Sequence, residues 1–329
     1  MSKKTDKELQ NILFKKIQES IPSNRSLVDD IADLLKVSTD SAYRRLRGQT
    51  ILSIGETDTI CKHYNICFDN LYTENSSAVS FNFLQLQNEQ DFHKLLLYII
   101  GETELFAKTP DVKLYYAAID IPIFHHFNFR ELTSFKIFYW LKSVINAPLV
   151  EKLTYSPNFL PDETFSLCSQ ALETYKQFNS TEIWTDSTVN SLIKQISYFW
   201  ESGLFTSKKD ALTICDQAEQ EILNIRNFAE NSSKGGGKNN FNLFFSEIEI
   251  GNNSIFAVSK EYKRAYLSHN TINVMGTTHS VFCNETERWM NNLLKKSILI
   301  SSTSEKIRYQ FFNRALTGIS SLRDEINNQ

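Results

Sequence analysis

Residues 26–48 constrain the fold of this chain most, because they combine two short helical patterns with a tight turn between them. Ser26 can accept a hydrogen bond at the start of the first helix. The inner face of that helix has apolar residues at helical spacing, which are Leu27, Ile31 and either Leu34 or Leu35. Val37 is an apolar residue within the turn, and Ser38 can cap the second helix. Gly48 can end that helix in the left-handed conformation.

The second helix of this segment has a narrow apolar face. Ala42 and Leu46 are four residues apart, so they lie on the same side of a helix. Ala32 on the first helix is small, which allows the two helices to cross closely. The pattern therefore predicts a helix, a turn and a second helix that protrudes with its N-terminal residues accessible.

Further helices are predicted on both sides of this segment. Residues 7–20 have an amphipathic pattern that ends at Pro22. After Gly48, a fourth helix is indicated by Ile54, Ile60 and Tyr64, and residues 65–72 suit a short closing helix. Residues 73–80 are small and polar, as linkers often are. We therefore predict a helical domain over residues 1–74.

This order of helices resembles the lambda-repressor-like (Cro/CI, or Xre-type) helix-turn-helix family. The resemblance covers residues 26–72 of the 329-residue chain, or residues 7–72 if the first amphipathic helix belongs to it. Two positions depart from the family. Residues 51–53 (Ile-Leu-Ser) stand where proline is common, and Val28 stands where a glutamine often supports the recognition helix. Arg25 is the nearby residue that can replace the contact of this glutamine.

Carried over to this sequence, the resemblance implies that the second helix of residues 26–48 contacts DNA. Arg44 is the candidate for a bidentate contact with a guanine edge. Arg45 and Arg47 either contact phosphates or pack against neighbouring helices. The full set of candidate DNA-binding residues is Arg25, Ser38, Thr39, Asp40, Ser41, Tyr43, Arg44, Arg45 and Arg47. The alternative interpretation is that the three arginines of this helix are an ordinary solvated face.

Net charge does not by itself indicate a nucleic-acid partner. The chain has 35 Lys plus Arg and 38 Asp plus Glu, which gives a net charge of −3. Residues 1–74 contain eleven basic and eleven acidic residues, so their charges sum to zero. DNA binding would therefore depend on where the charges are placed, and nonspecific binding is expected to be weak.

Residues 81–230 are predicted to form a helical domain for protein interaction or oligomerisation. Aromatic content is high throughout the chain, with 24 Phe and 13 Tyr. Helices are predicted over 88–108 and 130–146 and from starts near Pro161, Asp186 and Ser207. Residues 113–129 fit either a short helix or a strand that ends at Pro122. The aromatic residues between Tyr115 and Trp140 can line a ligand pocket, although their helical spacing favours a core.

The pattern changes after residues 231–240, which are rich in Asn, Ser and Gly and suit a linker. Strands are predicted over 241–250, 254–258, 262–268 and 271–275, followed by helices over 285–297 and 304–327. We therefore predict a mainly α protein whose last part, residues 240–329, is an α+β domain with a small antiparallel sheet. This domain would act as a sensor or in dimerisation.

No segment has a catalytic or metal-binding pattern. The five cysteines are widely spaced, which predicts buried thiols rather than disulfides or a zinc site. The adjacent His125 and His126 would point in different directions, and residues 235–237 (Gly-Gly-Gly) lack the Lys-Ser/Thr that follows a phosphate-binding loop. We expect no metal, no cofactor and no enzymatic activity.

These patterns together predict a sequence-specific transcription regulator. Its partner would be double-stranded DNA, and a homodimer would form through residues 81–329, which also have room to sense a small-molecule or protein effector. No uninterrupted apolar stretch of about 18 residues is present, and no apolar region follows the charged start, so we expect no membrane segment and a cytoplasmic location. The alternative is an interaction scaffold whose helix-turn-helix domain docks a partner protein.

Overall fold

The computed structural model describes residues 5–20, 26–64, 66, 68, 78–235, 240–260 and 262–329. The chain divides into two compact units. Unit 1 comprises Met1–Ser80 with His279–Val281, and unit 2 comprises Phe81–Thr278 with Phe282–Gln329. Each unit has its own hydrophobic core, so each is described by itself.

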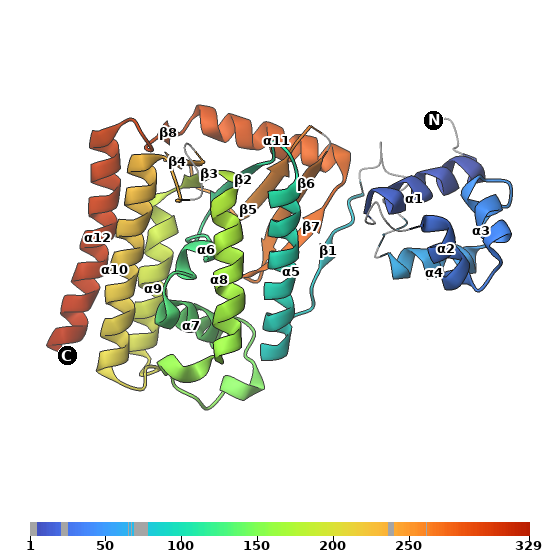
Figure 1. The fold of residues 1–329 in the computed structure, drawn as a ribbon. Helices are drawn as coiled ribbons and strands as arrows, with labels where there is room; N and C mark the ends of the chain where they lie inside the picture. Colours follow the sequence, from blue (N-terminus) through green and yellow to red (C-terminus); the bar gives the residue numbers. More distant parts are fainter. Residues whose placement is uncertain are drawn as a thin grey trace. The chain divides into compact units, whose positions relative to one another are not determined.

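The described part of unit 1 is helical (Figure 1). Its helices are α1 (Asp6–Ser20), α2 (Leu27–Leu35), α3 (Thr39–Leu46) and α4 (Ile54–His63). Their buried side chains form one core, which consists of Leu13, Phe14, Ile17, Ile31, Ala32, Ala42, Ile60 and Cys61. The helices predicted from the sequence up to Tyr64 are therefore confirmed. Pro22 and most of the predicted closing segment 65–72 lie outside the described residues, although Ile66 and Phe68 pack against this core.

In its described residues, unit 2 is built on an eight-stranded mixed sheet. In spatial order its strands are β1 (Asn82–Phe83), β7 (Asn273–Thr277), β6 (Lys263–His269), β5 (Ser254–Val258), β2 (Lys113–Ala118), β3 (Asn179–Trp184), β4 (Phe241–Phe245) and β8 (Ile298–Leu299). The pairs β2–β3 and β3–β4 are parallel, and the other neighbouring pairs are antiparallel. The two edge strands are the shortest, which limits unpaired backbone at the edges.

Helices pack on both faces of this sheet. They are α5 (Glu89–Lys108), α6 (Ile123–His126), α7 (Arg130–Tyr139), α8 (Asp162–Gln177), α9 (Asp186–Glu201), α10 (Lys208–Asn231), α11 (Ser280–Lys295) and α12 (Glu305–Asn328), with π-helical η3 (Trp140–Val144) and 3₁₀-helical η4 (Pro148–Val150) and η5 (Pro157–Phe159). Helices α9, α10 and α12 lie side by side (Figure 1).

The side chains of β2 show how the layers are organised. Leu114, Tyr116 and Ala118 belong to the larger core, whereas Ala117 belongs to a smaller core that contains residues of α11 such as Met290. Successive side chains of a strand point to opposite faces of the sheet. The strand is therefore covered on both faces, with α11 on the side opposite to the larger core.

The sheet corrects the fold prediction in two respects. It is mixed rather than antiparallel, and β2 and β3 come from residues that were predicted to form a purely helical middle domain. For residues 113–129, the structure has a strand to Ala118 followed by α6. Strand β3 was not predicted from the sequence, because Ser180 and Glu182 are polar residues that are nevertheless buried. The segments predicted as two domains, 81–230 and 240–329, both supply strands to this sheet.

The helix predicted over 130–146 begins at Arg130 as α7 and continues as the π-helical η3 to Val144. In the segment predicted as a linker, Lys234 is only 2% exposed, so this position is part of the core; residues 236–239 lie outside the described residues. Cys61, Cys168, Cys215 and Cys283 are buried as predicted, and Cys67 lies outside the described residues. No helix in the described part of the chain is long and apolar enough to cross a membrane.

Candidate nucleic-acid interface

Helices α2 and α3 are joined by residues 36–38. Lys36 ends α2 in the left-handed conformation with φ 52°, and its side chain points away from the core as an exposed residue. Ser38 then caps α3, because its hydroxyl accepts a hydrogen bond of 3.3 Å from the Ser41 amide. Ala42 is fully buried in the core of unit 1. Local capping and one small buried residue therefore set the start of α3 and the side that it turns inward.

The opposite side of α3 is exposed to solvent. Its exposed residues are Thr39, Asp40, Tyr43 and Arg44, and the exposed Arg47 follows directly as the C-cap of the helix. With 3.6 residues per turn, these five side chains occupy an arc of about 140° around the helix. This set, which we call the α3 face, contains two arginines, one carboxylate, one hydroxyl and one aromatic ring. Such a mixture of donors and acceptors suits contact with base edges and phosphates.

Asp40 and Arg44 form an ion pair within the α3 face. The Nε of Arg44 lies 3.0 Å from Oδ2 of Asp40, and the two side chains are 60% and 72% exposed, respectively. An exposed pair with this i,i+4 spacing contributes only about 0.3–0.5 kcal/mol. The pair is therefore weak enough to rearrange when a ligand binds, yet it gives Arg44 a preferred orientation.

Tyr43 and Arg47 form a second contact on the same face. The guanidinium carbon of Arg47 lies 4.7 Å from the centre of the Tyr43 ring, which is a cation–π arrangement. Tyr43 is 43% exposed, so the ring supports the arginine without being buried by it. Both arginines of the α3 face thus have a neighbour on the helix that orients them.

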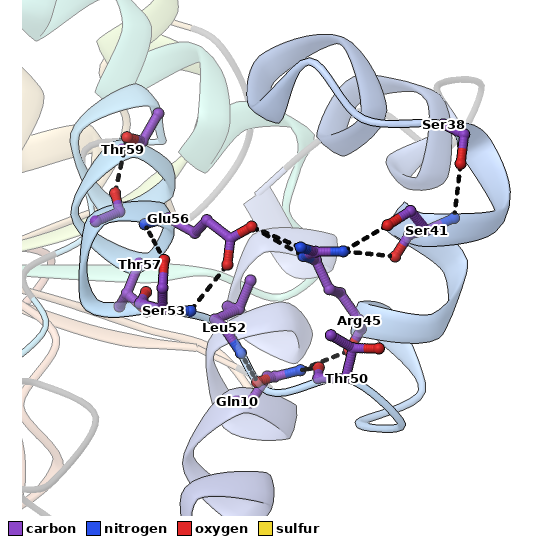
Figure 2. A network of polar contacts seen from close by, with 11 residues as sticks. Gln10, Ser38, Ser41, Arg45, Thr50, Leu52, Ser53, Glu56, Thr57 and Thr59 are labelled. Atoms are coloured by element: carbon purple, nitrogen blue, oxygen red, sulfur yellow. Dashed lines mark hydrogen bonds and ion pairs between the residues drawn. The ribbon is translucent and has the colours of Figure 1, made fainter.

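Arg45 points the other way and joins α3 to α4. Its guanidinium donates to Glu56 Oε1 at 2.7 and 3.1 Å, to the Ser41 hydroxyl at 2.6 Å and to the Ser41 carbonyl at 3.2 Å (Figure 2). Although burial raises the pKa of Glu56, hydrogen bonds from the Ser53 amide and Arg45 outweigh it and hold that pKa below its ordinary value. Of the two alternatives predicted for Arg45, the structure therefore shows packing against a neighbouring helix.

Gln10 on α1 holds the other end of α3. Its side-chain amide donates to the carbonyls of Arg45 at 2.7 Å and Thr50 at 2.9 Å, and its Oε1 accepts from the Leu52 amide at 2.8 Å (Figure 2). Gln10 is buried, and it supplies partners to the Thr50 carbonyl and the Leu52 amide, whereas the Arg45 carbonyl also accepts from the Gly48 amide at 2.9 Å. Together, Gln10 and the Arg45–Glu56 contacts fix α3 between α1 and α4.

Gln10 and Glu56 were not among the functional residues predicted from the sequence. Glu56 had a local signal, because Ser53 and Glu56 form a capping box at the start of α4. Gln10 had a weaker one: it occupies the position that continues the apolar stripe of Leu13, Phe14 and Ile17. A polar residue on a buried stripe indicates a specific hydrogen-bonding role.

The predicted site residues fall into three groups. Ser38 and the α3 face are exposed, Ser41 and Arg45 are partly buried in the contacts with α4, and Arg25 lies outside the described residues. Gly48 has φ +66°, as predicted for the end of α3, and a Cβ there would lie 2.9 Å from Cγ of Lys7. The glycine is therefore needed both for its backbone conformation and for its close approach to α1.

The two adjacent histidines of unit 2 have different partners, as their spacing predicted. His125 Nε2 lies 3.0 Å from a carboxylate oxygen of Glu182 on β3, and His126 Nδ1 lies 2.7 Å from Glu221 on α10. All four side chains are buried. Within the described residues, no cluster of three or more histidine, cysteine or acidic side chains is arranged to hold a metal ion.

Glu182 is the centre of a buried polar network. It also accepts hydrogen bonds from Tyr175 and, at 2.8 Å, from the indole of Trp184. Burial raises the pKa of Glu182, but His125 and the hydrogen bonds outweigh this effect and lower the pKa overall.

Nearby, the ammonium of Lys234 donates to the hydroxyl of Ser180 at 2.7 Å and lies 3.9 Å from the Tyr175 ring centre. Burial lowers the pKa of Lys234 to about 7, against the opposing influence of Glu182.

Comparisons of the chain with protein-family models, with curated proteins and with solved structures find no match.

Proposed function

We propose that unit 1 binds double-stranded DNA through the α3 face and that the protein is a sequence-specific transcription regulator. The observation that carries this proposal is the combination of a short exposed helix with a fixed orientation. An α-helix with its side chains is about 10–12 Å across, and the major groove of DNA is about 12 Å wide. The contacts of Gln10 and Arg45 hold α3 in place without using the side chains of its exposed face.

The side chains of the α3 face can contact both the bases and the phosphates of DNA. Arg44 can donate to a guanine edge and Thr39 to a base or a phosphate, whereas Arg47 suits a phosphate oxygen. Because Asp40 and the acidic first turn of α2 lie in the same unit, attraction to the backbone is modest. Specific contacts should therefore supply a larger part of the affinity than they do in strongly basic domains.

The test begins with selection of bound duplexes from random DNA by the full chain. We expect Thr39→Ala/Arg44→Ala to lower the affinity for the selected duplex by at least about tenfold, since each good base contact contributes about 1–3 kcal/mol. Arg288→Ala is the matched control, because it removes an exposed arginine from unit 2. Unchanged affinity and unchanged preference of the double variant would contradict the assignment of α3 as the DNA-binding helix.

A homodimer formed through residues 81–329 is part of the proposal. One helix of this length makes few contacts, so tight binding to one half-site is not expected. Two copies related by twofold symmetry would bind a roughly palindromic site with half-sites about one helical turn apart. Light scattering of the full chain, alone and with the selected duplex, measures this stoichiometry. One copy per duplex would exclude the dimer.

A partner protein is the alternative ligand of unit 1. Two exposed apolar side chains favour a partner protein. Ile51, 48% exposed, precedes α4, and Ile54, 92% exposed, is the first residue of α4. A salt series separates the two functions. DNA affinity falls with a slope of about 0.9 per phosphate contact in a plot of log affinity against log salt. Failure to select any duplex at low salt would favour the partner protein.

A further inference from the structure

We propose that Asp40 and Arg44 act together as a base-recognition pair that requires a cytosine and a guanine within two base-pair steps of each other. This inference rests on the proposed DNA binding and specifies the sequence that the α3 face would select. Its basis is the ion pair on that face. A helix that contacts DNA is expected to carry basic side chains, but here the carboxylate of Asp40 lies beside Arg44.

The ion pair prepares Arg44 for a bidentate contact. Asp40 approaches the Nε of Arg44, and within the described residues the guanidinium has no second polar partner. Its two terminal nitrogens are therefore available, and they are the atoms that match O6 and N7 of guanine. Because the guanidinium is already oriented by Asp40, less side-chain entropy is lost when the guanine binds.

Asp40 itself limits which base can lie beside it. A carboxylate only accepts hydrogen bonds, so it is repelled by the acceptors that guanine and thymine present in the major groove. Cytosine presents the N4 amino donor there and no adjacent acceptor. Oδ2 of Asp40 is next to Arg44, which leaves Oδ1 to accept from this amino group. Asp40 is thus both the residue that orients Arg44 and a specificity residue in its own right.

The spacing of the two residues sets the spacing of the two bases. Four residues of an α-helix rise about 6 Å, and successive base pairs are about 3.4 Å apart. Side chains one turn apart can therefore contact the same base pair or base pairs up to two steps apart. A selected site without a guanine and a cytosine in this relation would contradict the inference.

The sharpest test is Asp40→Asn, assayed by selection from random DNA with the full chain. Asparagine both donates and accepts, and it pairs with N6 and N7 of adenine. We expect the preferred cytosine to be replaced by adenine, with at least about a fivefold change in relative affinity for the two bases. The guanine position should be retained. Asp33→Asn is the matched control: it makes the same change in charge at an exposed position of α2 and should leave the selected sequence unchanged.

Arg44→Lys tests the other half of the pair. Lysine keeps the positive charge but lacks the planar fork, so we expect the guanine preference to fall by at least about fivefold while the salt dependence stays the same. Identical selected sequences for the wild type, Asp40→Asn and Arg44→Lys would overturn the inference and leave DNA binding intact. If the wild-type chain enriched no sequence at all, the proposed function would fail, and this inference with it.

Discussion

Units 1 and 2 use their charged side chains in opposite ways. In unit 1, the ion pair Asp40–Arg44 lies on an exposed helix, and the better-covered pair Arg45–Glu56 holds that helix in place. In unit 2, Glu182, His125 and Lys234 are buried within the larger core. The first arrangement leaves charge exposed to solvent, whereas the second places charged groups where they affect folding.

The energetic consequences of the two arrangements differ by about an order of magnitude. An exposed pair contributes a few tenths of a kcal/mol, but removing one partner of a buried pair costs about 3–5 kcal/mol because the other is left uncompensated. We therefore expect substitutions on the α3 face to change binding without changing stability, and substitutions in the buried network to do the reverse. All four tryptophans, Trp140, Trp184, Trp200 and Trp289, belong to unit 2, so their fluorescence reports on that unit.

The largest effect is expected for Glu182→Gln. The substitution keeps the volume but removes the buried carboxylate that lies 3.0 Å from His125, and an amide cannot accept all the bonds that Glu182 accepts. Unit 2 should lose about 3–5 kcal/mol of stability. Urea unfolding followed by tryptophan fluorescence measures the loss, with Glu285→Gln on the exposed side of α11 as control. A loss equal to that of the control would mean that the network does not stabilise the core.

Gln10→Met should produce the next largest effect, confined to unit 1. It keeps the length of the side chain but removes three hydrogen bonds to the backbone of residues 45–52. At about 1 kcal/mol for each bond, the expected loss is about 2–3 kcal/mol. Hydrogen exchange in the full chain should speed up in α3 and at the Leu52 amide, while tryptophan fluorescence is unaffected.

The control for this substitution is Gln18→Met, because Gln18 is an exposed residue on the same helix. Equal exchange rates in the two variants would show that Gln10 does not hold α3.

Lys234→Met should change the pH dependence of unit 2. Burial lowers the pKa of Lys234 to about 7 in the folded state, whereas it is near its ordinary value of 10.5 in the unfolded state. Between these values the unfolded chain binds more protons, so the wild type gains stability as pH rises. From pH 7 to pH 9 the gain amounts to about 2 kcal/mol. Urea unfolding at both pH values should show this gain in the wild type and in the exposed control Lys209→Met, but not in Lys234→Met. The same pH dependence in all three would rule out an ammonium that deprotonates in the core.

The smallest effect on stability is expected for Asp40→Ala. Loss of an exposed i,i+4 pair should destabilise unit 1 by no more than about 0.5 kcal/mol. Hydrogen exchange of α3 in the full chain should therefore match the wild type within a factor of about two to three, even though selection from random DNA changes. A large increase in exchange would show that the pair stabilises the helix, and it would weaken the comparison between the units.

The sequence by itself determined the local structure of unit 1. The caps at Ser26 and Ser38 and the left-handed Gly48 follow from hydrogen bonds and steric limits within a few residues. In unit 2 the starts of α8, α9 and α10 were predicted for the same reason. Where an element depends on its immediate neighbours in the chain, the pattern of residues is sufficient.

Only the tertiary structure decided which polar residues are exposed and which are buried. Arg44 and Arg45 are adjacent and chemically identical, but Glu56, eleven positions away, draws Arg45 inward and leaves Arg44 on the α3 face. Gln10 finds its partners 35 to 42 positions along the chain. Strand β3 lies between β2 and β4, and its buried Glu182 finds a partner in His125, 57 positions away. A buried polar group is tolerated only when its partners are in place, and those partners come from segments that the fold brings together.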